Sequence, residues 1–287
     1  MKVLSFGEVL WDIYPDKKFI GGAPFNFSAH LSKHGHIVSL ISAVGADAYG
    51  DDALCQLKTH GILTDYISVL DNKQTGACLV TLDCSSVPTY NLLQDVSYDY
   101  ISCNEVSGEF DVLYFGTLSL RSLYNYASLK KLIENNCFGE IFVDLNIRPP
   151  FYSEETVVFA LQKATILKIS IEEMPMVAKM LQVPEYTDYK DFARYLKEIF
   201  SNLKCIIVTL GSEGAYAFDC ATNKEVLCGS VKTKVASTVG AGDSFSAAFL
   251  HKYKTCDLKS VLKYANKVAA FVVSQYDAVP DYKANLL

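Results

Sequence analysis

The chain has 287 residues, of which 50% are hydrophobic and 20% charged, so it is long and apolar enough to bury a large core. Its formal net charge is −6 and its 26 Lys and Arg residues are scattered, which argues against a nucleic-acid-binding surface. Glu8 and Asp12 interrupt the N-terminal region too early for a signal peptide, and no apolar run approaches the roughly 18 residues of a membrane helix. We therefore expect a cytoplasmic protein that binds neither nucleic acid nor membrane.

Short β-rich runs alternate along the chain with segments long enough for a helix. In chain order these runs cover residues 2–6, 37–45, 111–116, 140–146, 165–170 and 204–211. The alternation predicts an α/β fold with a mostly parallel sheet that is covered by helices on both faces.

Two stretches, residues 12–20 and 76–101, depart from this alternation. Within the second, "GACLVTLD" (76–83) and "PTYNLLQDVSYDYI" (88–101) read as successive strands joined by turn residues. Extra strands of this kind often form a lid over a ligand site. No low-complexity segment, repeat or Pro/Gly-rich linker divides the chain, so we expect one domain, 1–287, with its lid from about 12–20 and 76–101.

Cysteine and histidine usage gives no clear sign of a disulfide or a metal centre. The chain has nine cysteines, an odd number, and several of them, such as Cys78 and Cys205, lie in apolar strand-like runs. We expect reduced, mostly packed thiols. His30 and His34 have the i, i+4 spacing of a metal-binding helix face, but no acidic residue or cysteine accompanies them nearby. We expect both to be solvated surface histidines.

In an open parallel sheet, ligands bind at the carboxyl ends of the strands, and four loops there carry polar residues. In the first, Asp12 follows the first strand, Gly21 and Gly22 allow a ligand to approach the backbone, and Asn26 lies one turn into an expected helix. These groups suit a polyhydroxylated ligand, because each sugar hydroxyl both donates and accepts a hydrogen bond. The alternative is a glycine turn with a capping Asn.

The next two loops follow the strands at 140–146 and 165–170. Asp144, Asn146 and Arg148 alternate where a buried strand emerges, which packing explains poorly, although a solvated loop is the alternative. Glu173 lies at a strand-to-helix junction. It could act on a metal through water, or it could simply favour the first turn of the helix.

The fourth loop, "VTLGSEGAYAF", places Thr209, Gly211 and Gly214 in a turn between two strands. It has no Gly-Lys-Ser/Thr and so is not a Walker A loop. The first strand likewise lacks the Gly-x-Gly-x-x-Gly of a dinucleotide fold, which argues against a dehydrogenase. By itself this loop is only a hairpin signal.

Near the C-terminus, "STVGAGDSFSAAF" (237–249) predicts a glycine turn that opens a helix. Gly240, Ala241 and Gly242 have almost no side chain, and the N–H groups of a helix start are unpaired and carry positive dipole charge. An anion such as phosphate can therefore bind there. The alternative is that Asp243 only caps the helix.

Together these motifs resemble the ribokinase-like carbohydrate kinases, and within them most closely the fructokinases. The resemblance rests on "GGAPFNFSAHLSKHG" (21–35), "VTLGSEG" (208–214) and "STVGAGDSFSAAF", and it spans nearly the whole chain. The combination is specific because two long signatures occur in the right order. It implies a three-layer sandwich with a mostly parallel central sheet and a small β lid, and transfer of the γ-phosphoryl group of ATP to a sugar hydroxyl. It also leaves a homodimer through the lid open.

The resemblance further implies roles for individual residues. Asp243 would be the general base, and Gly240, Ala241 and Gly242 would form the anion hole. The sugar would be held by Asp12, Gly21, Gly22 and Asn26, with Arg148 beside them; the nucleotide would be held by Thr209, Gly211, Gly214 and Asn266. Mg²⁺ would bridge the phosphates of ATP, with Glu173 reaching it through water.

The resemblance also bears on the substrate and on a monovalent cation. Ribose and phosphosugar members usually have Lys after the double glycine, whereas this chain has Ala23-Pro24, the fructokinase-like form, which favours free fructose. Ser237 stands where Asp is common, Ser170 replaces the Asn of Asn-x-x-Glu, and "YDA" (276–278) replaces "SGA". These departures put a monovalent-cation requirement and some nucleotide contacts in doubt.

Two alternatives are kept. The acceptor could be another small polyol-like molecule, such as ribose, 2-keto-3-deoxygluconate or a nucleoside. The chain could also be a catalytically silent relative that binds a sugar or nucleotide as a regulator.

Overall fold

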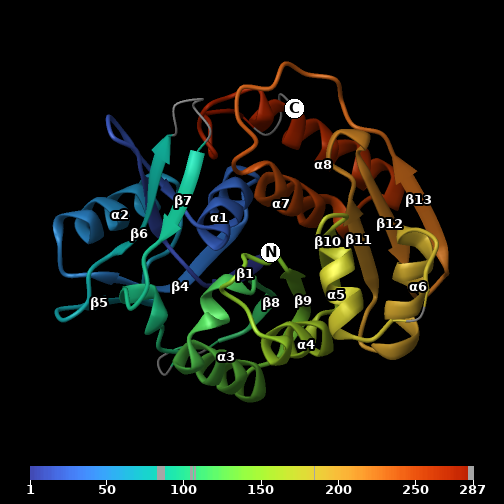
Figure 1. Ribbon diagram of the computed structural model, residues 1–287, viewed down its shortest axis with the longest axis horizontal. Helices are drawn as coiled ribbons and strands as arrows, with labels where there is room; N and C mark the ends of the chain where they lie inside the picture. The colour runs from blue at the N-terminus through green and yellow to red at the C-terminus, as the bar shows by residue number, and fades with distance from the viewer. Residues whose placement is uncertain (83–87, 104–105, 107, 184, 284–287) are drawn as a thin grey trace.

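A nine-stranded sheet runs through the centre of the molecule in the order β13-β12-β11-β10-β9-β8-β1-β4-β5 (Figure 1). The computed structural model describes residues 1–82, 88–103, 106, 108–183 and 185–283. The strands of this sheet are β1 (Lys2–Phe6), β4 (Ile37–Gly45), β5 (Ile67–Leu70), β8 (Phe110–Phe115), β9 (Phe138–Asp144), β10 (Ile166–Ser170), β11 (Cys205–Thr209), β12 (Ala215–Asp219) and β13 (Lys224–Cys228).

Most of this sheet is parallel, as expected. All pairs from β5 through β11 are parallel, and only β12 and β13 run antiparallel to their neighbours. The six strands expected from the sequence are confirmed. The turn between two strands expected at 209–214 is confirmed as well, because β11 and β12 form an antiparallel hairpin. Gly214 makes that hairpin with φ of 105°, and a Cβ there would lie 2.1 Å from the carbonyl oxygen of Cys228.

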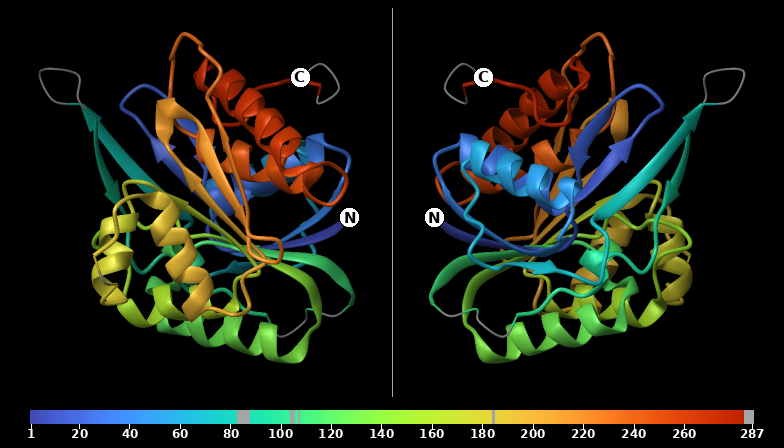
Figure 2. Two further views of the ribbon diagram at one scale, coloured as in Figure 1. Left: turned by 90° about the vertical axis from the view of Figure 1, so that its right-hand side faces the viewer. Right: turned by 90° about the vertical axis from the view of Figure 1, so that its left-hand side faces the viewer.

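Helices cover both faces of the sheet (Figure 2). On one face lie α1 (Ala23–Lys33), α2 (Ala48–Thr59), α7 (Ala241–Tyr253) and α8 (Leu258–Val273); on the other lie α3 (Leu123–Asn135), α4 (Glu154–Lys163), α5 (Met174–Met180) and α6 (Tyr189–Ile199). Successive strand residues alternate between the two cores: Val3 packs with the α1, α7 and α8 side chains, and Leu4 packs in the opposite core. This confirms the three-layer α/β architecture.

A second, four-stranded sheet forms the expected β appendage, in the order β3-β2-β6-β7. Its strands are β2 (Leu10–Ile13), β3 (Lys18–Gly21), β6 (Gly76–Leu82) and β7 (Pro88–Leu92). Asp12 lies inside β2, because this strand begins at Leu10, two residues before the start expected for the 12–20 stretch. The strand expected at 88–101 is shorter in the structure: it ends at Leu92, and a short 3₁₀ turn follows at 97–99. Residues 83–87, which belong to the expected stretch 76–101, lie outside the described residues.

The prediction of solvated histidines was wrong. His30 is fully buried and His34 is 9% exposed. The ring of His30 hydrogen-bonds the carbonyl oxygen of Ala278 (2.9 Å) and the hydroxyl of Tyr282 (2.8 Å), and burial lowers its pKa to about 3. The C-terminal segment covers this face of α1, so the pair serves packing.

The cysteines of the described residues are all free thiols, as expected. Cys78 and Cys205 are buried, but three others are exposed: Cys55, Cys137 and Cys256. Over the part of the chain that the structure describes, no helix combines the length and the apolar character needed to cross a membrane.

Candidate active site

The glycine turn before α7 opens that helix, as the sequence indicated. Gly240 is its N-cap, with φ of 78°, and a Cβ there would lie 2.6 Å from the carbonyl oxygen of Ala278. A larger residue would therefore push this turn and the 276–279 segment apart. The N–H of Ala241 donates to the carbonyl oxygen of Thr238 (3.3 Å), whereas the N–H groups of Gly242 and Asp243 have no partner within the helix and so can bind an anion.

Asp243 lies in the first turn of α7 and is 9% exposed. Its Oδ2 accepts a 2.7 Å hydrogen bond from Nδ2 of Asn26, on helix α1. Burial and the nearby charge of Asp144 raise the pKa of Asp243 to about 6, although the Asn26 bond opposes the shift. The group is thus a stronger base than an ordinary carboxylate and is still mostly ionised at neutral pH. The other amide atom, Oδ1 of Asn26, is buried without a protein partner among the described residues.

The first loop leads into helix α1 and lies close to Asp243, which Asn26 of that helix contacts. Gly22 is the N-cap of α1, with φ of 108°, and a Cβ there would lie 2.4 Å from the carbonyl oxygen of Glu8. A Cβ on Gly21 would lie 3.0 Å from Oδ2 of Asp12. Burial raises the pKa of Asp12 to about 6, and the positive charge of Arg148 opposes that shift.

Glu8 is a candidate site residue that the sequence reasoning missed. It lies two residues after the end of β1, is 3% exposed, and its Oε1 accepts a 3.2 Å hydrogen bond from the Ala23 N–H. Burial, with a contribution from the charge of Asp243, raises the pKa of Glu8 to about 7. A carboxylate close to the end of a buried strand was the signal that drew attention to Asp144, and it could have identified Glu8 as well.

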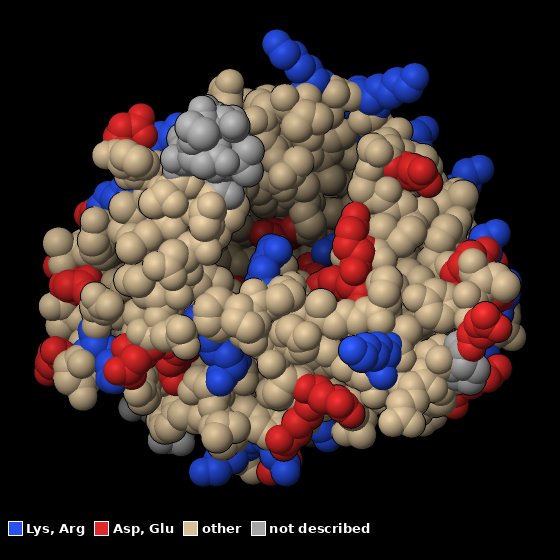
Figure 3. Space-filling view, viewed as in Figure 1, with Lys and Arg blue, Asp and Glu red and all other residues tan. Residues whose placement is uncertain are grey.

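Arg148 is exposed, and its positive charge lowers the pKa of three carboxyl groups: Glu8, Asp12 and Asp243. The structure therefore brings the candidate residues of the first loop, the second loop and the C-terminal turn within electrostatic reach of one another. Figure 3 shows the molecule hollowed on this side, with both acidic and basic side chains visible inside the hollow.

Asp144 belongs to a buried ion pair and not to a solvated loop. Both of its oxygens accept hydrogen bonds from Nζ of Lys168 (2.9 and 2.7 Å), and Oδ2 also accepts one from the Ser246 hydroxyl (3.0 Å). The side chains are 2% and 8% exposed. A Cβ on Gly242 would lie 3.2 Å from Nζ of Lys168, so the pair supports the glycine turn from beneath.

Glu173 ties together two loops at the sheet edge. Its Oε1 accepts from the Ile147 N–H (2.6 Å) and its Oε2 from the Ser170 N–H (2.7 Å). Burial raises its pKa, and these hydrogen bonds oppose the shift. Among the described residues, no three His, Cys, Asp or Glu side chains come together in a way that could hold a metal ion.

The candidate nucleotide residues lie around the end of β13. Thr209 ends β11, and a Cβ on Gly211 would meet nothing within 4 Å, so this turn faces open space. Asn266, on α8, donates from Nδ2 to the carbonyl oxygens of Cys228 (3.0 Å) and Gly229 (3.1 Å). Its amide hydrogens therefore already hold the end of β13, which makes Asn266 a positioning residue in this structure.

Comparison with known proteins decides the family. A model of the pfkB family of carbohydrate kinases matches residues 7–284. The chain belongs to that family. The membership confirms the resemblance inferred from the two signatures, and it identifies the chain as a carbohydrate kinase.

Individual members of the pfkB family match the chain over nearly its whole length. A probable fructokinase of Arabidopsis thaliana is 26% identical and covers 97% of this chain and 92% of its own. A 5-dehydro-2-deoxygluconokinase of Lacticaseibacillus casei is 28% identical and covers 96% and 86%. The crystal structure of an uncharacterized sugar kinase from Pyrococcus horikoshii in complex with ATP is 26% identical, with a TM-score of 0.82 and coverage of 99% and 96%. The expected ribokinase-like fold is confirmed by this likeness.

Ser237 and Asp277, two positions that depart from the pattern expected from the resemblance, lie in the segments beside the glycine turn. The Ser237 hydroxyl accepts a 3.2 Å hydrogen bond from the Val239 N–H, and the Ser237 N–H donates to the carbonyl oxygen of Val273. Asp277 accepts from the Val279 N–H at 3.0 Å, in the segment that packs against Gly240. Ser237 thus serves the loop itself, and Asp277 is the acidic residue of the adjoining 276–279 segment.

Proposed function

We propose that this pfkB kinase transfers the γ-phosphoryl group of ATP to a hydroxyl of a free sugar, with fructose as the acceptor. The observation that carries the proposal is the position of Asp243. This carboxylate is buried, has a pKa of about 6 and is held by Asn26. It lies in the first turn of a helix whose N–H groups can bind the transferring phosphoryl group. A base and an anion site side by side are what phosphoryl transfer to an alcohol requires.

The reaction follows from this arrangement. Asp243 takes the proton of the acceptor hydroxyl, whose oxygen bonds to the γ-phosphorus. The bond from that phosphorus to the β–γ bridging oxygen breaks, and ADP leaves with the electron pair. The N–H groups after Gly240 stabilise the charge on the transferring group, since they are fixed by the helix before the reaction begins.

The remaining candidates would hold the two substrates. Asp12, the backbone at Gly21 and Gly22, and Asn26 would bind sugar hydroxyls, with Arg148 supplying positive charge beside them. The turn carrying Thr209, Gly211 and Gly214 would receive the nucleotide, with Asn266 behind it. Magnesium on the phosphates would neutralise charge, with Glu173 contacting it through water. The β2-β3-β6-β7 sheet would close over the sugar within a single catalytic domain and exclude water as a competing acceptor.

The choice of fructose rests on Ala23-Pro24 and on the fructokinase among the relatives. A relative that acts on 5-dehydro-2-deoxygluconate keeps a sugar acid as the second candidate. The test is sugar-dependent release of ADP, with fructose, ribose, 2-keto-3-deoxygluconate, 5-dehydro-2-deoxygluconate, adenosine and fructose phosphates as acceptors. We expect the highest kcat/KM with fructose. Absence of ADP release with every acceptor would favour a silent regulator.

Replacement of Asp12 by Ala should raise the KM for the sugar far more than the KM for ATP. The substitution removes a hydrogen-bond partner of the acceptor and leaves the phosphate site intact. Asp16→Ala is the matched control, because Asp16 is exposed at the tip of the same hairpin. Equal increases in both KM values, or equal effects of the two substitutions, would argue against a sugar contact at Asp12.

Potassium should matter little to this kinase. A serine hydroxyl is neutral and a poorer ligand for a hard cation than a carboxylate, and the hydroxyl of Ser237 already serves the Val239 N–H. Exchange of K⁺ for a large organic cation at constant ionic strength should change kcat by less than about threefold. Activation of about tenfold or more at millimolar K⁺ would show that other ligands, with Asp277 the first to test, preserve the site.

A further inference from the structure

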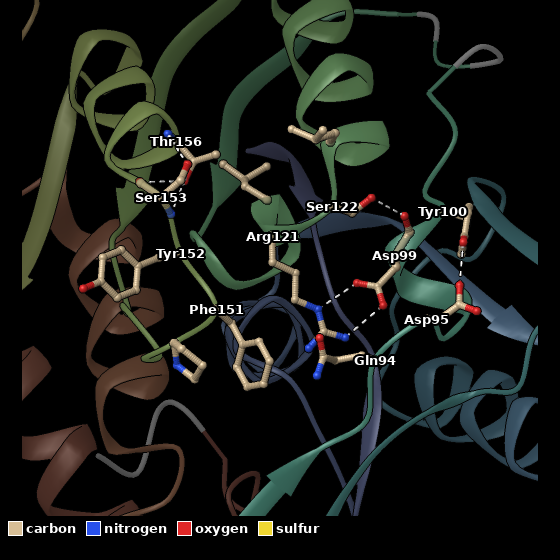
Figure 4. Close-up of a pocket in the computed structure, with 13 residues that line it drawn as sticks. Gln94, Asp95, Asp99, Tyr100, Arg121, Ser122, Phe151, Tyr152, Ser153 and Thr156 are labelled. Atoms are coloured by element: carbon tan, nitrogen blue, oxygen red, sulfur yellow. Dashed lines mark hydrogen bonds and ion pairs between the residues drawn. The ribbon is translucent and has the colours of Figure 1, made fainter.

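A cavity of about 540 Å³ lies beneath the base of the lid, within the size range of small-molecule sites (Figure 4). We call it the Arg121 cavity. It lies between the segment after β7, the 3₁₀ turn after β8 and the loop after β9, and its principal lining residues are Gln94, Asp99, Arg121, Phe151, Tyr152 and Ser153.

The Arg121 cavity continues the candidate acceptor site along the same edge of the sheet. β1, β8 and β9 are adjacent parallel strands, so the residues that follow them emerge side by side. Glu8 follows β1, Arg121 follows β8, and both Arg148 and Phe151 follow β9. Glu8 also interacts electrostatically with Arg121 and with Tyr98.

Arg121 has one nitrogen, Nη1, whose N–H groups are unused, and its charge is already neutralised. Nε and Nη2 donate to the two oxygens of Asp99 (2.8 and 2.9 Å), and Nη2 also donates to the carbonyl oxygen of Leu93 (2.7 Å). The side chains of the pair are only 8% and 10% exposed. The guanidinium stands 4.8 Å from the ring centroid of Tyr98 and 5.0 Å from that of Phe151, which fixes its orientation.

Nη1 of Arg121, a residue that lines the cavity, is buried and has no partner among the described residues; the hydroxyl of Tyr98, whose ring lies against the guanidinium, is also buried without a partner there. Buried polar groups in folded proteins are nearly always hydrogen-bonded, and an unmet donor is costly. A small shift of the cavity wall would let an oxygen of a bound molecule reach Nη1, which is buried in this structure. The question is whether that oxygen belongs to a neutral group or to a carboxylate.

The charges around the cavity favour a neutral group over a carboxylate. Among its described lining residues there are two carboxylates, Asp95 and Asp99, and one cation, Arg121. Asp95 has an ion pair with Lys73, and Asp99 uses Arg121 through two parallel hydrogen bonds. Among these lining residues, which do not include Arg148, a ligand carboxylate would lose water and find no uncompensated positive charge, whereas a hydroxyl or carbonyl oxygen needs only the unused nitrogen of Arg121.

We propose that the Arg121 cavity receives the end of the acceptor remote from the transferred phosphoryl group, and that the Arg121–Asp99 pair makes the enzyme select neutral sugars over sugar acids. The inference rests on the proposed function and narrows its substrate class. Two activities are named among the relatives, a fructokinase and a kinase of a sugar acid, and the inference favours the first for this chain.

The test compares kcat/KM for fructose and for 5-dehydro-2-deoxygluconate in the wild type and in two variants. Asp99→Asn keeps the shape of the pair and leaves the charge of Arg121 uncompensated. Gln94→Lys adds a cation at an exposed lining position without touching the pair, and so remains informative if Asp99→Asn fails to fold. Asp191→Asn is the control, because Asp191 belongs to an exposed ion pair with Arg194 on α6.

The wild type should favour fructose, and each cavity variant should shift the ratio of kcat/KM values toward the acid by about tenfold or more, as removal or addition of one charge near a partly desolvated site predicts. Asp191→Asn should leave the ratio unchanged. A wild type that uses the acid as well as fructose, or folded variants whose ratio stays within about twofold of the wild type, would overturn this inference alone. Failure of every acceptor to release ADP would instead overturn the proposed function, and the inference with it.

Discussion

Asp243→Asn is expected to lower kcat by about 10²- to 10⁴-fold, with only a modest change in the KM for the sugar. The amide has nearly the same shape as the carboxylate, and its oxygen can still accept the hydrogen bond from Asn26, so the turn should keep its geometry. What it loses is the ability to take a proton. Steady-state kinetics with the best acceptor, together with a thermal melt to confirm folding, measures the effect.

The control is Asp257→Asn. Asp257 is an exposed carboxylate that caps α8, and Asn caps a helix about as well, so this variant should keep wild-type activity. A variant Asp243→Asn that retained half of the wild-type kcat would rule out general-base catalysis by this residue.

The pH profile gives a second check of the same assignment. A base acts in its deprotonated form, so kcat/KM of the wild type should fall as the pH drops through about 6, the pKa of Asp243. The pKa of Asp12 is also about 6, and its protonation would weaken sugar binding over the same range. The fall should therefore persist in Asp12→Ala, where Asp243 still titrates together with Glu8, whose pKa is about 7.

Local sequence patterns were enough to predict the parts of the fold that local chemistry determines. The glycine turn at 240–242 opens a helix because no larger residue fits its backbone, and the apolar runs form strands because they are buried on both faces. The short, half-exposed strand β5 lacked such a run and was missed. The roles of the site residues remain predictions, although the structure brings Asp12, Asn26 and Asp243 to one sheet edge.

Features that depend on distant contacts were not accessible from the sequence. The spacing of His30 and His34 shows that they share a helix face, but their burial depends on Ala278, Tyr264 and Tyr282, more than 200 positions away. The run "TILKIS" reads as a buried strand with an unexplained lysine. Its explanation is the register of β9 and β10, in which Lys168 lies opposite Asp144.

That register leads to the largest expected effect on stability. Lys168→Met should lower the free energy of unfolding by about 3–5 kcal/mol, because it leaves the Asp144 carboxylate buried without its counter-charge. The lost interaction is not the main cause. A charge that cannot reach water and has no partner is unfavourable in the folded state, whereas it is solvated in the unfolded state. Denaturant unfolding monitored by fluorescence or circular dichroism would measure the loss.

Two companion variants separate this cause from a simple loss of packing. Asp144→Asn combined with Lys168→Met removes both charges, so it should recover most of the stability lost by Lys168→Met alone. Lys204→Met breaks an ion pair in which the lysine is 53% exposed and Lys254 also approaches the same carboxylate of Glu140, so it should cost no more than about 1 kcal/mol. If the double variant were as unstable as Lys168→Met, the buried charge would not be the cause, and the aliphatic stem of Lys168 packed beneath Gly242 would have to be.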